Sequence, residues 1–154
     1  MGFCELFTMA LLIFSSTATW KDERCASMRF IARDYINLGR FEEAKMWLDK
    51  AMKEAPHLRD PFIERAFLAN IQEDWSNVEK YSLDALKITK HLKTYINEPF
   101  SFDETVYDLL SIAKYYLGKK GKAIKWADMA IKINPSNERL KKNKEIIQNK
   151  SDII

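Results

Sequence analysis

Apolar residues recur three and four positions apart along most of the chain, which is the spacing of one face of an α-helix. A clear run is Met28, Ile31 and Tyr35. The charged residues Arg29, Arg33 and Asp34 lie between them, and Leu48 continues the apolar pattern in the next predicted helix. The spacing therefore predicts an all-α protein made of short amphipathic helices that pack against one another.

The same arrangement of small and large residues is written three times with a period of 34 residues. The copies cover residues 25–58, 59–92 and 104–137. The equivalent small residues are Ala32, Ala66 and Ser111; Ala44, Val78 and Ala123; and Ala51, Ala85 and Ala130. Small side chains let two helices approach closely. A period of this length is typical of stacked helix pairs that bury their apolar faces against their neighbours.

Turn signals divide each copy into two helices. Gly39 and Gly118 stand where a helix needs a left-handed residue to end. The second copy has Glu73–Asp74 at this place, so we expect it to turn without glycine. The Ser-x-x-Glu pattern of Ser76–Glu79 matches a capping box and predicts that Ser76 starts the next helix.

Two segments follow or interrupt the repeats. Residues 136–150 predict a final helix whose polar outer face caps the stack. Its apolar residues Leu140, Ile146 and Ile147 are expected to face the last repeat. Residues 93–103 are an insertion between the second and third copies. Its apolar residues are Tyr95, Ile96, Phe100 and Phe102. Two interpretations stay open: these side chains pack on neighbouring helices, or the insertion closes over a groove or docks another domain.

Residues 1–16 are mostly apolar but too few to span a bilayer. We expect them to form a helix that caps the first repeat or remains from a preceding one. The alternative is a secretory signal peptide over residues 1–18. No Lys or Arg precedes the apolar run and Glu5 interrupts it, which disfavours a signal peptide. The expected location is therefore the cytoplasm.

Length and cysteine content fit a single cytoplasmic domain. The chain has 154 residues, of which 47% are hydrophobic, enough for one packed core. Cys4 and Cys25 are the only cysteines, and neither lies in a metal-ligand spacing. Two cysteines make no disulfide framework, so we expect buried or indifferent thiols in a reducing compartment.

The charge is distributed unevenly. The net charge is +3, but the segment from Lys114 onward holds eleven Lys and Arg against four Asp and Glu. A solvated basic end is the favoured interpretation, because no aromatic stacking residues alternate with the lysines. An acidic partner, an anionic membrane surface or nucleic acid is the alternative.

The residues offer no evident active site. His57 and His91 are the only histidines, and neither has a Ser or Cys nucleophile at a recognisable spacing. Gly121–Lys122 lacks the upstream glycine and the following Ser or Thr of a phosphate-binding loop. The sequence therefore predicts no catalytic residue, no cofactor and no metal.

The repeated pattern resembles the tetratricopeptide repeat, a helix-turn-helix unit that stacks into a right-handed α-α superhelix. This resemblance implies three such repeats, with flanking N- and C-terminal helices, in a domain of residues 17–150. In this family the first helix of each pair lines a concave groove that binds proteins or peptides. The matching positions here are Arg29, Phe30, Arg33, Asn37, Asp60, Ile63, Glu64, Phe67, Asn70, Asp108, Ile112, Tyr115 and Tyr116.

Arg29 and Arg33 lie one helical turn apart in this predicted groove. They are placed to hold a carboxylate or phosphate of a ligand together, or to pair with a neighbouring acid such as Glu64. Some chaperone-binding members of the family grip a C-terminal carboxylate with Lys, Asn and Arg. Leu109 stands where a basic residue would be needed, so we do not transfer that function.

The amino-acid sequence of the repeats also resembles that of a narrower group, the C-terminal tetratricopeptide tails of bacterial GT-A-type glycosyltransferases. The resemblance covers about residues 17–148. It rests on Thr17–Tyr35, Glu54–Pro61, Trp75, Ala85–Ile88, Tyr95–Pro99, Asp108–Ser111 and Asn134–Asn143. It implies a tail detached from a catalytic domain, with Met1 as an internal start or the product of a gene break.

We therefore expect a non-catalytic scaffold that binds a protein or peptide, with a glycosyltransferase catalytic domain as a candidate partner. Two alternatives stay open. The first is that the chain is a fragment of an active glycosyltransferase. The second, which is less favoured, is that its basic C-terminal end binds nucleic acid or an anionic surface. We expect no membrane span, and an uncapped N-terminal face leaves self-association open.

Overall fold

A computed structural model describes residues 2, 9, 20–92, 94 and 96–150 of the chain. Within these residues the fold has seven α-helices, one short 3₁₀ helix and no strand, which confirms the expected all-α class. They are α2 (Lys21–Asn37), α3 (Phe41–Glu54), α4 (Asp60–Ile71), α5 (Trp75–Lys87), η1 (Pro99–Ser101), α6 (Thr105–Tyr116), α7 (Lys120–Ile133) and α8 (Glu138–Asn149). The helix expected over residues 1–16, and the signal-peptide alternative, fall almost entirely outside the described part.

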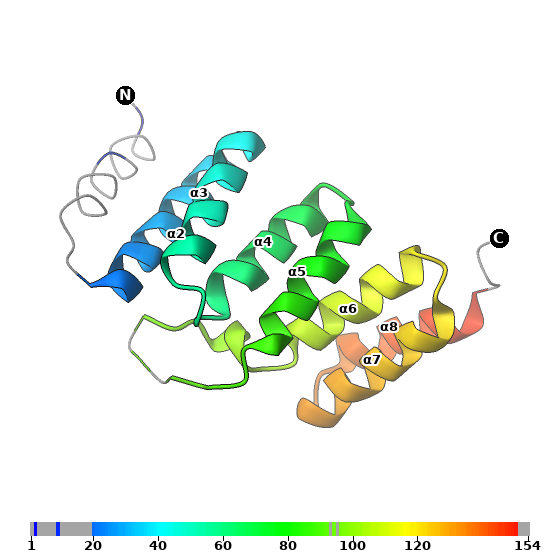
Figure 1. The fold of residues 1–154 in the computed structure, drawn as a ribbon. Helices are drawn as coiled ribbons and strands as arrows, with labels where there is room; N and C mark the ends of the chain where they lie inside the picture. Colours follow the sequence, from blue (N-terminus) through cyan, green and yellow to red (C-terminus); the bar gives the residue numbers. More distant parts are fainter. Residues whose placement is uncertain (1, 3–8, 10–19, 93, 95, 151–154) are drawn as a thin grey trace.

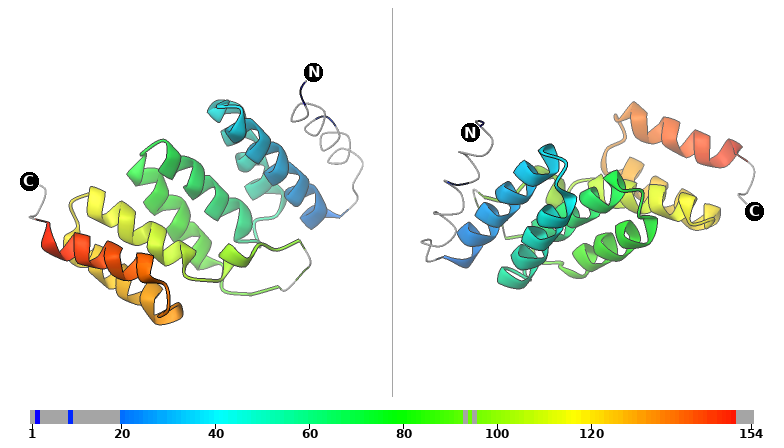
Figure 2. Two further views of the ribbon diagram at one scale, coloured as in Figure 1. Left: turned by 180° about the vertical axis from the view of Figure 1, so that it is seen from behind. Right: turned by 90° about the horizontal axis from the view of Figure 1, so that it is seen from above.

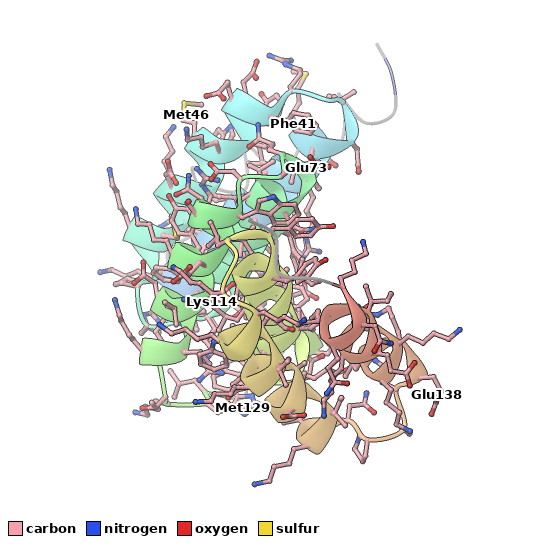
Figure 3. All side chains as sticks on the ribbon, turned by 90° about the vertical axis from the view of Figure 1, so that its right-hand side faces the viewer. Phe41, Met46, Glu73, Lys114, Met129 and Glu138 are labelled. Carbon is pink, nitrogen blue, oxygen red and sulfur yellow. The ribbon has the colours of Figure 1, made fainter. Side chains whose placement is uncertain are left out.

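Consecutive helices form antiparallel pairs that stack side by side, with α2 and α8 at opposite ends of the stack (Figure 1). The pairs are α2 with α3, α4 with α5, and α6 with α7, and α8 packs on α7. Contacts also join α2 to α4 and α4 to α6, so the first helices of the pairs line one side of the array (Figure 2). A view along the array shows α3 with Met46 on one side and α8 with Glu138 on the other (Figure 3).

The helix ends confirm the predicted turns. Gly39 and Gly118 have φ values of 71° and 72°, the left-handed conformation that costs glycine little. Glu73 takes the equivalent place in the second pair with φ of 55°. The second copy therefore makes the same left-handed turn with a residue that pays a steric penalty for it.

The predicted cap of α5 is wrong by two residues. This helix begins at Trp75, and the side chain of Asp74, not Ser76, accepts a hydrogen bond from the backbone N–H of Asn77 at 3.2 Å. Asp and Ser serve equally well as N-caps, so the sequence pattern alone does not separate them.

The small residues at the nine matching places are all buried, as the packing argument requires. Alanine at most of them lets the paired helices approach. The one polar member, Ser111 on α6, donates its hydroxyl to the carbonyl of Ala123 on α7 at 2.9 Å, so it costs no unsatisfied polar group.

One core cluster spans the second and third pairs in spite of the insertion between them. It joins Ile63 and Ala66 of α4, Val78 of α5, and Val106 and Leu109 of α6. The inserted residues are therefore accommodated outside the stack, and the helices on either side of them remain in contact. None of the described helices is both long enough and apolar enough to cross a bilayer.

Candidate functional site

The thirteen predicted groove residues lie on α2, α4 and α6, but fewer of them reach the surface than a groove requires. Five are buried, namely Arg29, Asp60, Ile63, Glu64 and Asp108. Six are partly buried, namely Phe30, Arg33, Phe67, Asn70, Ile112 and Tyr115. Asn37 and Tyr116 are exposed. The buried five are thus removed from the surface that is open to a partner.

Arg29 and Arg33 of α2 hold a carboxylate of α4. Glu64 Oε1 accepts from Arg29 Nη1 and from Arg33 Nη2, both at 2.6 Å. Burial by itself lowers the pKa of Arg29, but the carboxylates of Glu64 and Asp60 outweigh it and raise that pKa above its ordinary value. Both guanidiniums remain charged, and the interpretation that they pair with Glu64 is confirmed.

The insertion reaches the same arginines from the outside. Arg29 Nη2 donates to the backbone carbonyl of Ile96 at 3.0 Å, and Arg33 Nη2 donates to Glu98 Oε1 at 2.6 Å. Figure 2 shows the inserted chain as a long loop that leaves α5 and returns beside the start of α6. The side of the array lined by α2, α4 and α6 is called the concave side below. The loop covers the part of it formed by α2 and α4.

Asp60, at the start of α4, fixes the insertion from a second direction. Its Oδ1 accepts from the backbone N–H of Glu98 at 2.7 Å, and its Oδ2 accepts from Asn97 Nδ2 at 3.1 Å. The carboxylate of Asp60 is fully buried. A buried carboxylate needs donors, and the insertion supplies these two.

Phe100 packs on a neighbouring helix, so the first interpretation is confirmed for this residue, whereas the ring partners of Phe102 lie just outside the helices. Phe100 meets Phe67 of α4 edge to face, with ring centroids 5.3 Å apart. Phe102 stacks on His91 at 3.8 Å and lies under the guanidinium of Arg59. Tyr95 falls outside the described residues. The same packing draws the loop across the concave side, so it acts as a partial cover.

The other half of the concave side is open. A hollow of about 230 Å³ lies between α6 and α8. It is lined by Ile112, Tyr115, Tyr116, Asn143, Ile146, Ile147 and Lys150. Tyr116 and Ile146 are 52% and 50% exposed, which is high for large apolar side chains. The hollow therefore presents apolar surface to solvent beside one lysine.

An aromatic shelf continues the hollow toward α5. The ring of Tyr116 stacks on Trp75 with centroids 4.2 Å apart and meets Tyr115 edge to face at 5.3 Å. Ile71, at the end of α4, adds another half-exposed apolar side chain. Exposed apolar and aromatic side chains gathered in one place are typical of interaction sites.

The sequence arguments missed most of this hollow. Ile146 and Ile147 are adjacent on α8, and both were expected to face the last repeat. Ile147 is 4% exposed and does so, whereas Ile146 is half exposed. Trp75 stands at the repeat position that the aromatic Phe41 occupies in the first copy, but the period assigns it to the second helix of its pair and not to the groove. The side of α8 that meets α6 depends on a loop angle that no local pattern encodes.

Within the described residues, five of the eleven basic residues of the C-terminal end pair with acidic residues. Ion pairs join Lys114 and Lys119 to Glu79, Arg139 to Asp108, Lys141 to Glu138, and Lys144 to Asp128. Paired lysines offer less charge to a polyanion. The arrangement favours a solvated basic end, and nucleic-acid binding stays an untested prediction.

Nothing in the described residues assembles a reactive centre. Burial is the main cause that raises the pKa of Cys25 from 9.0 to about 12. His57 Nε2 lies 2.8 Å from Asp22 Oδ1, and His91 stacks on Phe102. In the part of the chain that the structure describes, no three His, Cys, Asp or Glu side chains are grouped to hold a metal ion.

We expect Cys25 to resist labelling in the folded protein. A pKa of about 12 leaves roughly a thousandth of the thiolate that a pKa of 9.0 leaves at neutral pH, and the side chain is inaccessible. In a Cys4→Ser variant, a fluorescent maleimide should label the chain in urea but not in buffer. Fast labelling of the folded variant would contradict the buried placement.

Comparisons with known proteins agree with this fold. The sequence model described as "Tetratricopeptide repeat" matches residues 31–58. No curated protein matches the chain. Among solved structures, the Arabidopsis OM64 TPR domain superposes with a TM-score of 0.71 at 14% identity, covering 86% of this chain and 100% of that one.

Two further similar structures contain bound peptides. The second TPR domain of human RPAP3, in complex with the HSP70 peptide SGPTIEEVD, has a TM-score of 0.70 at 15% identity and covers 84% of this chain and 99% of that one. The first TPR of Spaghetti (RPAP3), bound to the HSP90 peptide SRMEEVD, has a TM-score of 0.69 at 16% identity, with coverage of 82% and 94%. The chain therefore carries a tetratricopeptide repeat at residues 31–58 and has the fold of a tetratricopeptide repeat domain.

Proposed function

We propose that residues 17–150 form a non-catalytic scaffold that binds a peptide segment of a partner protein, with the hollow between α6 and α8 as its main contact. The observation that carries the proposal is the half-exposed pair Tyr116 and Ile146 at the mouth of that hollow. Solvent-exposed anchors of this size lose unfavourable water contact when a partner covers them.

The size of the hollow favours a peptide side chain over a small molecule. Its volume of about 230 Å³ lies below the roughly 300–1,000 Å³ that is usual for small-molecule sites. Lys150 is among the residues that line it, so one cation borders the apolar surface. These features support a segment with one apolar anchor followed by an acidic residue.

The bound peptides of the two similar structures support a peptide as the kind of ligand, but we do not propose those peptides for this chain. Arg29 and Arg33 already hold Glu64 and Glu98. Leu109 is buried and carries no charge to add to theirs. For the main contact, the preference we propose therefore comes from the α6–α8 hollow.

A random peptide library displayed on phage tests this proposal. We expect the domain to enrich peptides whose affinity, measured by fluorescence anisotropy, falls at least tenfold in Tyr116→Ala and in Ile146→Ser. Ile133→Ser is the matched control, because Ile133 on α7 is 47% exposed but lies outside the hollow. Failure to enrich any peptide, or equal affinity of the Ile146 and Ile133 variants, would contradict the proposal.

The sequence resemblance supports a narrower form, in which the partner is the catalytic domain of a bacterial glycosyltransferase. The free, buried thiol of Cys25 supports a reducing compartment, and we propose the cytoplasm. Sequencing the DNA upstream of the Met1 codon tests the link. A catalytic domain there, in frame or frameshifted, favours it, whereas an unrelated gene with its own stop codon counts against it.

A further inference from the structure

We infer that Arg29 and Arg33 form a second binding site, for an extended acidic segment of the partner, and that Glu98 of the chain's own insertion occupies this site as a resident substitute. The inference rests on the proposed function, because it assumes a peptide partner on the concave side. It adds a second site, the chemistry of its ligand and a competitor built into the chain.

The contacts of the insertion are those of a bound peptide. Between Ile88 and Glu98 the described residues form no helix, and the segment meets the repeats through main-chain and side-chain groups together. The carbonyl of Ile96 accepts from Arg29, the N–H of Glu98 donates to Asp60, and the carboxylate of Glu98 accepts from Arg33. Main-chain bonds with one charged side chain are a common mode of peptide recognition.

The charges show that Glu98 is replaceable. Within the repeats, the two guanidiniums of Arg29 and Arg33 face the two carboxylates of Asp60 and Glu64. These four charges balance, so the departure of Glu98 strands no buried cation. The side chains of Glu98 and Arg33 are 23% and 37% exposed, where solvent screens an ion pair. The site therefore accepts one carboxylate from outside the repeats without requiring a particular one.

The arginine site has one unused hydrogen-bond donor and an adjoining hollow. Arg29 Nε is buried and has no hydrogen-bond partner among the described residues. A hollow of about 230 Å³ adjoins Glu98 and is bordered by Phe67 of α4 and Phe100 of the insertion. Arg33 also lines this hollow, so a partner segment entering here meets a guanidinium beside apolar surface.

The resident segment also indicates the sequence that the site prefers. Glu98 reaches the arginines, and Phe100, two residues later, packs edge to face on Phe67. Pro99 stands between them and limits the backbone to few conformations, which lowers the entropy lost on docking. We therefore expect a partner segment with an acidic residue two positions before an aromatic one.

Competition from the tethered segment sets the affinity that a partner segment needs in order to displace Glu98. A segment joined to its site by a short loop acts at an effective concentration on the order of millimolar. A free peptide at micromolar concentration loses to it. A partner that also occupies the α6–α8 hollow is held nearby and displaces Glu98 by the same effect.

A peptide with the sequence of the insertion tests the exchange. The probe is fluorescein-labelled Thr-Tyr-Ile-Asn-Glu-Pro-Phe-Ser-Phe, residues 94–102. We expect at least tenfold tighter binding to an Asn97→Ala/Glu98→Ala variant of the full chain than to the wild type. Glu98→Gln alone, which keeps the hydrogen bond from Asn97 to Asp60, should give a smaller gain in the same direction.

Two controls assign the binding to the arginine pair. A probe with Gln in place of its Glu should lose most of its affinity, and Arg33→Gln in the released variant should do the same. Equal affinity of wild type and both released variants would overturn the inference. If library peptides still depend on Tyr116 and Ile146 in that case, the proposed function stands without this second site.

Discussion

Replacing Arg29 with methionine should lower the free energy of unfolding by about 3–5 kcal/mol, the range measured when one partner of a buried ion pair is removed. The guanidinium is almost fully buried, and it pairs with Glu64 at 2.6 Å and lies 3.9 Å from Asp60. Its removal leaves the buried carboxylates of Asp60 and Glu64 with one cationic partner fewer. Urea unfolding followed by circular dichroism measures the loss.

Arg33→Met is the matched control for this prediction. Arg33 binds the same Glu64 oxygen at the same 2.6 Å, but its side chain is 37% exposed. We expect a loss of about 1 kcal/mol or less, since exposed pairs contribute little. A double variant, Arg29→Met with Glu64→Leu, should recover part of the loss because it removes both charges. Equal losses for the Arg29 and Arg33 variants would contradict the placement of Arg29 beneath the insertion.

The case of Arg29 shows where sequence reasoning ends. The period assigned Arg29 and Arg33 correctly to one side of one helix, because helical spacing is a local property. The burial of Arg29 comes from Ile96 and Glu98, which are 67 and 69 positions away in the chain. No local pattern encodes which insertion crosses which helix, so a residue predicted to be on the surface lies under a loop.

The turns and the core were easier to predict, since they depend on residues that are close in sequence or repeated. Left-handed Gly39 and Gly118, and the buried small residues, follow from sterics that act the same way in every copy. The hollow at Tyr116 and Ile146 was only half predicted. Tyr116 follows from the period, whereas Ile146 becomes part of the site through the angle between α7 and α8.

Replacing Ile63 with alanine should lower the free energy of unfolding by about 2–5 kcal/mol. Ile63 was expected in the groove, but it is fully buried in the core cluster that joins α4, α5 and α6. Truncation removes apolar surface from a close-packed interior and leaves a cavity that rigid neighbouring helices fill only in part. Ile71→Ala is the matched control on the same helix, because Ile71 is 51% exposed, and its effect should stay within about 0.5 kcal/mol.

The shape of the unfolding transition of the Ile63→Ala variant is as informative as its midpoint. Since Ile63 contributes to a cluster shared across the insertion, its loss should weaken the second and third helix pairs together and leave one cooperative transition. Tryptophan fluorescence reports on both sides of the insertion, from Trp75 on α5 and Trp126 on α7. The chain has four tryptophans, so two single-tryptophan versions of the variant are compared, one that keeps only Trp75 and one that keeps only Trp126, with the others replaced by phenylalanine. Separate midpoints for these two versions would mean that the insertion divides the stack. In that case α6 to α8, with the open hollow, would unfold independently of the arginine site.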